Sequence, residues 1–270
     1  ALARRLGIHD QRTELDEVLR SDFARAFNSD YGRQTSATLL TQYRMAPPIG
    51  DLVSQIFYRG QLENGARAIP DIYQGAPAAL RSPVTWLDTA NLGDYAHHKS
   101  DRGASIYNRC EADQVIDLLK QVSESGQFIT DLSKLKEKDD ALIGVICMYS
   151  EQKRLIRQKF NQEIWHEGFK SLVKIDTVDS YQGKENRIII LSVVRNDTSR
   201  TIGFLSDPER INVAMSRARD RLIVVSSSAM WQSHPRSPMH SVLEEIRKLA
   251  ASDLAAFVPS QDLKRSVAHA

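Results

Sequence analysis

SDPERINVAMSRARDRLIVV, residues 206–225, contains a helix start, a group of arginines and a β-forming run in direct succession. Asp207 before Pro208 fits an N-cap followed by proline at the first helical position. Ser206 with Glu209 fits a capping box that would begin one residue earlier. Either way, a helix is predicted to begin near residue 208. The apolar run that closes the stretch reads as a strand, so a turn, a helix and a strand are expected in that order.

The predicted helix buries one apolar stripe against a sheet. That stripe consists of Ile211, Ala214, Met215 and Ala218. At about 100° per residue, Arg210 and Arg217 share one flank of the stripe and Arg219 lies on the other. A guanidinium group is planar and permanently charged, which suits phosphate oxygens. The helix therefore presents candidate phosphate-binding arginines at a domain edge, with salt bridges alone as the alternative.

Composition limits the function without assigning one. Lys+Arg 36 against Asp+Glu 34 gives a net charge of +2, so any phosphate site must be local. Cys110 and Cys147 have no paired spacing, and the histidines have no ligand spacing, so neither a disulfide scaffold nor a metal site is expected. No run of membrane-spanning length and no secretory leader is present, which predicts a soluble, intracellular protein without a membrane partner. The chain begins at Ala1 within helical sequence, so we expect a piece of a longer protein.

Apolar runs and helical periodicity alternate along the chain. The expected strands are residues 84–88, 141–148, 172–175, 187–194 and 222–225. The expected helices are residues 1–30, 108–125, 150–167, 242–249, one opened by Pro47-Pro48 and the one near 208. Residues 60–82 and 91–104 read as loops, and residues 134–140 as a solvated loop or a helix end. Strands that alternate with helices without hairpin turns indicate an α/β fold with a mostly parallel sheet covered on both faces.

Two further stretches carry chemistry. Gln42, Tyr43 and Arg44 lie between a short extended run and the helix from Pro47, and such strand-to-helix corners hold ligand-binding groups in α/β proteins. TVDSYQGKE, residues 177–185, lies between two predicted strands. Its small side chains would let peptide N–H groups reach phosphate oxygens, although these are also ordinary turn residues.

Three stretches together resemble, in order and spacing, the second motor domain of superfamily 1B helicases, in the Upf1-like group with its Dna2-like and Sen1-like relatives. They are QYRM at 42–45, TVDSYQGKE at 177–185 and RINVAMSRAR at 210–219. Shorter matches occur at 48–49, 57–60 and 202–205, and the likeness covers about residues 36 to 228. It implies a RecA-like three-layer domain over residues 36–250, a helical lead-in from the first motor domain over 1–35 and a loosely packed tail over 251–270.

In that family ATP binds in a cleft between two RecA-like domains. The resemblance implies that Arg44 and Arg217 reach the γ-phosphate as catalytic residues, that Tyr43 packs on the adenine and that Glu185 lies near the ribose and phosphates. The implied ATP-binding residues are Gln42, Tyr43, Gly183, Glu185 and Arg219. For Arg219 an ion pair with Glu185 is the alternative role.

The resemblance also implies a track for single-stranded RNA or DNA. Its implied contacts are Tyr149, Thr177, Val178, Asp179 and Ser180. This chain departs from the family at Cys147-Met148-Tyr149, where relatives usually carry Thr-Pro-Tyr, so one hydroxyl contact is missing.

The sequence contains neither a Gly-x-x-x-x-Gly-Lys-Ser/Thr loop nor an acidic pair after an apolar strand. ATP with Mg²⁺ is therefore expected to be bound mainly by a first motor domain that precedes Ala1, and the chain alone is expected not to hydrolyse ATP. The alternative is a non-catalytic nucleic-acid or partner-binding module derived from a helicase. Intact Arg44, Glu185 and Arg217 favour the motor domain.

Overall fold

In the computed structural model the chain divides into two units, residues 1–40 and 41–270. The structure describes residues 26, 29–35, 39–100, 105–137, 140–181, 183–197 and 202–260. The first unit contains α4 (Asp30–Thr35), and most of the helix expected over residues 1–30 lies outside the described residues. The second unit begins at Thr41, later than the boundary expected after residue 35.

The second unit is built on a six-stranded sheet in the order β5-β4-β6-β7-β3-β8. Its strands are β3 (Val84–Asp88), β4 (Ile143–Cys147), β5 (Val173–Thr177), β6 (Asn186–Ser192), β7 (Ala218–Ser226) and β8 (Ala255–Pro259). Every neighbouring pair is parallel. The expected parallel sheet is therefore confirmed, and a short parallel pair, β1 (Thr41–Gln42) with β2 (Glu63–Asn64), accompanies it.

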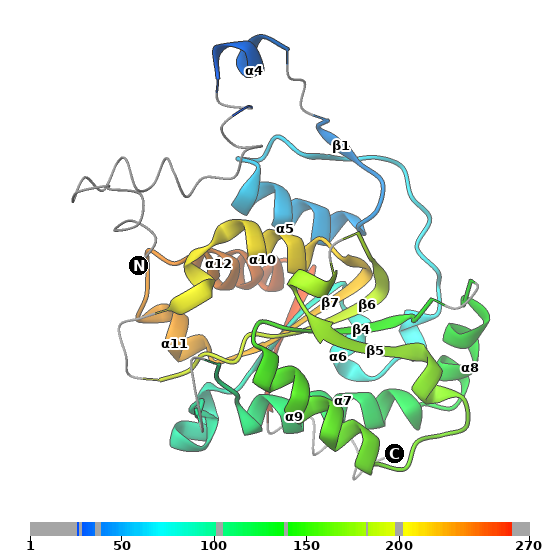
Figure 1. Ribbon diagram of the computed structural model, residues 1–270. Coiled ribbons are helices and arrows are strands. Elements are labelled where there is room, and N and C mark those ends of the chain that lie inside the picture. The colour runs from blue at the N-terminus through cyan, green and yellow to red at the C-terminus, as the bar shows by residue number, and fades with distance from the viewer. Residues whose placement is uncertain are drawn as a thin grey trace. The chain divides into compact units, whose positions relative to one another are not determined.

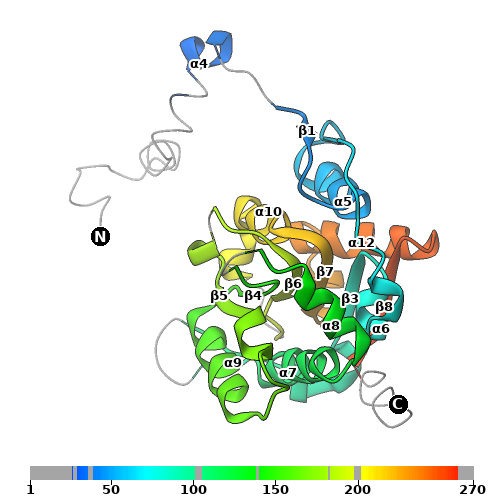
Figure 2. The same cartoon turned by 90° about the vertical axis from the view of Figure 1, so that its right-hand side faces the viewer.

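Helices cover both faces of the sheet (Figures 1 and 2). One face carries α5 (Pro47–Phe57), α10 (Pro208–Met215) and α12 (Pro238–Ala251), and the other carries α7 (Arg109–Ser123) and α9 (Ser150–Gln162). Alternating residues of one strand serve the two cores: Ile189 joins the α5 side and Ile190 the α7 side. This is the three-layer architecture predicted from the sequence. Among the described residues, no helix has the length and apolar character that crossing a membrane requires.

Shorter elements connect the longer helices and strands, and those at residues 73–81 and 90–96 overlap segments expected to be loops. They include α6 (Ala78–Arg81), α8 (Gln127–Lys134), α11 (Ser228–Gln232) and the 3₁₀ helices η1 (Tyr73–Gly75), η2 (Ala90–Ala96), η3 (Phe169–Leu172), η4 (Asp179–Tyr181) and η5 (Gly203–Ser206).

The tail from residue 251 was expected to pack loosely, and this is wrong for β8. Residues 255–259 pair in parallel with β3 and form one edge of the sheet. The Phe257 ring lies parallel to that of Trp86, with centroids 6.4 Å apart. Pairing with β3 satisfies backbone groups of this short run and buries part of its apolar surface, which the weak periodicity of the sequence did not reveal.

The helix at residues 208–215 begins as predicted and ends early. The Asp207 side chain accepts from the N–H of Glu209 at 2.9 Å, which confirms it as the N-cap before Pro208. The helix ends at Met215, and Ala218 begins β7. Arg217 and Arg219 therefore lie in a turn and in a strand, and their predicted positions on helix flanks are wrong. Pairing of β7 with β6 takes precedence over local helical periodicity here.

Candidate functional site

Four charged residues meet at the amino ends of β6 and β7. Glu185 immediately precedes β6, while Arg217 and Arg219 flank the first residue of β7. Arg44 joins them from the corner before α5: it forms an ion pair with Glu185 and donates to the carbonyl of Ser216 at 3.3 Å. The structure thus brings together residues that the sequence places in three separate stretches.

Gln42 shapes the corner that carries Arg44. Its Oε1 accepts from the N–H groups of Arg44 and Met45 at 2.9 and 2.7 Å, and its Nε2 donates to Asn64 Oδ1 at 2.7 Å. Gly50 of α5 leaves room for that last bond, because a Cβ there would lie 1.9 Å from Asn64 Oδ1. The Gln42 side chain is therefore fully engaged in positioning the corner.

Tyr43 presents its ring to solvent, and its side chain is 66% exposed. The ring lies against the backbone of Gly65, where a Cβ would come within 2.1 Å of its Cε1. The N–H of Gly65 donates to the carbonyl of Gln42 at 2.8 Å, so Gly65 is held beside the ring just after β2. An exposed, supported aromatic ring of this kind can stack on a flat ligand.

The arginines outnumber the acid at this edge. Glu185 Oε1 lies 3.7 Å from Arg219 Nε, and the other oxygen pairs with Arg44. No ion pair with a carboxylate is found for Arg217 within the described residues. Burial lowers the pKa of Arg217, the nearby charge of Arg44 lowers it further and Glu185 opposes both. The cluster therefore carries excess positive charge and would be stabilised by an anion.

Arg217 is held in place by backbone carbonyls. Its Nε donates to the carbonyl of Val213 at 3.1 Å, and its Nη1 donates to that of Lys184 at 3.4 Å. These bonds orient the guanidinium group without pairing it to a carboxylate. Such an orientation suits a group that acts on an incoming phosphate.

The parallel strands all begin on one side of the sheet, the amino edge, and all end on the other, the carboxyl edge. The segment that follows β5 connects these two sides. It starts at the carboxyl end of β5, passes over β4 and reaches the amino end of β6, with residue 182 outside the described residues. Tyr181 is fully buried on the way, and its hydroxyl donates to the carbonyl of Lys174 at 3.2 Å. Gly144 of β4 permits this close passage, because a Cβ there would lie 2.6 Å from the Tyr181 oxygen. Gly183, with φ of +78°, then makes the turn toward Glu185.

The carboxyl edge contains the residues expected to contact nucleic acid. Asp179 and Ser180 are exposed, and Thr177 Oγ1 donates to Ser180 Oγ at 3.2 Å. The Val178 side chain is buried in the core, and its N–H donates to the carbonyl of Cys147 at 3.3 Å. Val178 therefore anchors the segment, while its neighbours face solvent.

Tyr149, also expected to contact nucleic acid, is covered. Its side chain is only 3% exposed, and its hydroxyl accepts from Arg195 Nε at 3.3 Å. The Phe204 ring lies over it, with centroids 5.7 Å apart. Phe204 is an exposed aromatic at this edge, and sequence reasoning gave it no role because its exposure depends on tertiary packing.

Glu111 is a buried acid that sequence reasoning also missed. Its Oε2 accepts from Ser192 Oγ at 2.7 Å and from the N–H of Val194 at 2.8 Å. Burial raises its pKa to about 8, against these hydrogen bonds. Gln152 donates to the same Ser192 hydroxyl at 3.0 Å. The network holds the carboxyl end of β6 next to the start of α9.

A second buried acid, Asp220, supports the amino edge. It pairs with Arg67, accepts from Arg187 at 3.1 Å and from the Tyr73 hydroxyl at 2.9 Å. Burial and the Asp220 charge raise the Tyr73 pKa. Arg67 also donates to the carbonyl of Arg219 at 2.6 Å, so this cluster fixes the strand that carries Arg219.

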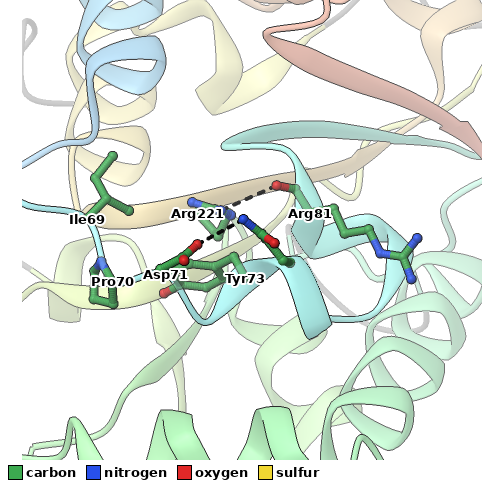
Figure 3. A pocket seen from close by; sticks show the side chains of 7 residues that line it. Ile69, Pro70, Asp71, Tyr73, Arg81 and Arg221 are labelled. Atoms are coloured by element: carbon green, nitrogen blue, oxygen red, sulfur yellow. Dashed lines mark hydrogen bonds between the residues drawn. The ribbon is translucent and has the colours of Figure 1, made fainter.

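A pocket of about 680 Å³ opens beside this cluster (Figure 3). It is lined by Ile69, Pro70, Asp71, Tyr73, Gln74, Arg81 and Arg221. The guanidinium of Arg221 lies 3.7 Å from the centroid of the Tyr73 ring and donates to the carbonyl of Leu80 at 2.7 Å. These contacts pack the Arg221 side chain against Tyr73 and α6. No group of three potential metal-binding acids, histidines or cysteines occurs in the part of the chain that the structure describes.

Comparison with known proteins identifies what the chain is similar to. A family described as "AAA domain" matches residues 18–229. The regulator of nonsense transcripts 1 homolog of Neurospora crassa is 32% identical over 207 residues, which cover 74% of this chain and 17% of that protein. ATP-dependent helicase upf1 of Schizosaccharomyces pombe is 31% identical over 198 residues, 73% of this chain and 20% of that protein.

A DNA helicase is also among the relatives. The 5'-3' DNA helicase ZGRF1 of Mus musculus is 32% identical over 192 residues, 70% of this chain and 9% of that protein. The chain thus spans a fifth or less of the length of these three relatives. The solved C-terminal domain of a possible DNA helicase from a Lactobacillus aligns with 69% of this chain and 88% of its own, at 12% identity and a TM-score of 0.36.

Proposed function

Because the chain belongs to the AAA domain family, as a Upf1-like helicase domain of superfamily 1, we propose that it is the second motor domain of an ATP-driven nucleic acid helicase. The observation that carries the proposal is the cluster at the amino edge of the sheet. There Arg44, Arg217 and Arg219 surround the single carboxylate of Glu185. Such an excess of fixed guanidinium groups matches the negative charge of a nucleotide phosphate.

The proposed chemistry is phosphoryl transfer to water. ATP binds in a cleft between this domain and a first motor domain, which also supplies the Mg²⁺ ligands. Mg²⁺ neutralises charge on the phosphates when it is bound. Arg217 and Arg44 stabilise the charge on the transferred phosphoryl group, Arg44 by exchanging its partner Glu185 for phosphate oxygens. Tyr43 stacks on the adenine.

The opposite edge of the sheet holds a single strand of RNA or DNA. Thr177, Asp179 and Ser180 offer hydroxyl and backbone groups to the sugar-phosphate chain. The segment with Tyr181 joins this edge to Glu185 and packs against β4. A displacement at the ATP site is therefore transmitted along this segment to the bound nucleic acid. We infer that this segment couples hydrolysis to translocation.

Nucleic-acid-stimulated ATPase of the parent protein, with both motor domains present, tests the proposal. Arg217→Ala should lower kcat by about 10³- to 10⁵-fold, as for other arginine fingers. Arg154→Ala, at an exposed pair with Glu151 in α9, is the matched control and should leave the rate unchanged. Thermal unfolding of both variants checks the fold. Undiminished ATPase in Arg217→Ala would contradict the role, and a parent without ATPase would favour a non-catalytic binding module.

A further inference from the structure

The carboxyl edge carries a stack of cations and aromatic rings drawn from four segments. Arg195 follows β6, Tyr149 follows β4, Phe204 lies in η5 and Arg210 in α10. The Arg195 guanidinium lies 5.9 Å from the Tyr149 ring centroid, and the Tyr149 and Phe204 centroids are 5.7 Å apart. The Arg210 guanidinium lies 4.9 Å from the Phe204 centroid. We call these four residues the cation–aromatic ladder.

Within the ladder only one ring is accessible. Phe204 is 52% exposed, while Tyr149 beneath it is 3% exposed. An exposed phenylalanine has no polar group to hydrate, so its exposure costs free energy unless something covers it. Leu205, the next residue, is fully buried and anchors η5. Phe204 is thus held at the surface by its surroundings.

Gly203 permits this placement. Its φ of +56° is a conformation that other residues rarely adopt. A Cβ at this position would lie 3.0 Å from both Arg195 Nη2 and the Tyr149 oxygen. A side chain here would therefore be strained and would press on Arg195 and Tyr149.

The ladder adjoins the segment assigned to the sugar-phosphate chain. Arg210 Nε lies 3.7 Å from an oxygen of Asp179, which belongs to that segment. It lies 3.8 Å from Asp207 as well. A strand that followed Thr177 and Ser180 would therefore pass next to the open face of Phe204.

We propose that Phe204 stacks against one base of the bound single strand, and that Tyr149 and Arg210 hold its ring in place. The inference rests on the proposed function, which supplies the single strand. Every nucleobase has a flat π face, so one aromatic platform accepts any sequence. Phe204, which covers Tyr149, would thus make the nucleic-acid contact that the resemblance assigns to Tyr149.

Binding of labelled oligonucleotides to the chain tests the inference. Oligouridylate and oligothymidylate are titrated by fluorescence anisotropy, and the polymer that binds the wild type tighter is compared with an abasic oligomer of the same length. Phe204→Ala should raise the Kd for the base-bearing oligomer by roughly 5- to 150-fold, the range for loss of one base–aromatic stack. The Kd for the abasic oligomer should stay unchanged. Phe204→Trp should restore binding of the base-bearing oligomer.

Two controls make the outcome decisive. Phe204→Leu retains apolar volume without an aromatic face, so it should fold and still weaken binding. It therefore replaces Phe204→Ala in the test if that variant unfolds. Tyr95→Ala removes an aromatic ring that is 62% exposed and bonded to Asp113 of α7, and it should have no effect. Unchanged binding in the folded Phe204 variants, or an equal loss on the abasic oligomer, overturns the inference alone. A wild type that binds neither polymer overturns the proposed function with it.

Discussion

Arg44 and Glu185 form an ion pair although 141 residues separate them in the chain. The pair joins the corner before α5 to the start of β6. Glu185 also lies 3.7 Å from Arg219, and its charge partly offsets that of Arg217. One carboxylate therefore lies near several guanidinium groups and offsets part of their charge.

The first prediction concerns Glu185→Gln. Loss of the carboxylate leaves the arginines to repel one another, so the free energy of unfolding in urea should fall by about 0.5–1 kcal/mol at low salt. High salt screens the repulsion and should remove most of this loss. Glu244→Gln, at an exposed pair with Arg247 in α12, should show little effect at either salt concentration. A loss that is equal at both concentrations would contradict the electrostatic explanation.

The architecture was predictable because its causes are local. Buried parallel strands appear as apolar runs such as residues 143–147, and the helices at Pro47 and Pro208 begin at proline, as predicted. Residues that meet at the amino edge were predictable only through resemblance, because their contacts link distant parts of the chain.

The remaining differences arise from tertiary packing. The Phe204 ring lies over Tyr149, and no local sequence pattern reveals which of these two aromatic rings faces solvent. Residues 255–259 become a strand only through pairing with β3. Glu111 looks like an ordinary polar position of a helix, and the hydrogen bond that it accepts from Ser192 links parts of the chain that are distant in sequence.

The second prediction concerns pH and Glu111. Its pKa is about 8 in the folded protein against 4.5 ordinarily, so the folded state keeps a proton that the unfolded state releases. The resulting stability is complete below pH of about 4.5 and is lost as pH rises to about 8. The loss attributable to this group is on the order of 5 kcal/mol, since one pKa unit corresponds to about 1.4 kcal/mol. Glu111→Gln cannot titrate and should lose less stability over this range.

Urea unfolding of both proteins at a series of pH values measures this difference. The Gln side chain can accept the Ser192 and Val194 hydrogen bonds through its oxygen, so the variant should fold. Parallel pH profiles of wild type and variant would show that Glu111 is ionised in the folded protein.

The third prediction concerns the passage of the connecting segment over β4. In Gly144→Ala the added methyl lies 2.6 Å from the Tyr181 oxygen and 2.6 Å from Asn186 Oδ1, so the segment must shift. Overpacking of this kind should cost about 1–3 kcal/mol. In the parent protein the nucleic-acid stimulation of ATPase should fall more than the basal rate.

Gly75→Ala is the matched control for Gly144→Ala. No atom lies within 4 Å of the methyl that it adds, so unfolding and ATPase should remain unchanged. If Gly144→Ala lowers stability but basal and stimulated rates fall in the same proportion, the segment does not couple the two edges.

The fourth prediction concerns the sheet edge formed by β8. Phe257 stacks on the buried ring of Trp86 and has the Arg247 guanidinium 5.5 Å from its own centroid. Phe257→Ala should cost about 1–2 kcal/mol in urea unfolding, below the 3–5 kcal/mol of a fully buried phenylalanine, because the ring is only partly buried. Near-UV circular dichroism should also change as the Trp86 environment opens. Leu254→Ala, a residue that is 45% exposed just before β8, should be neutral, and a Phe257→Ala as stable as this control would show that β8 contributes little to the sheet.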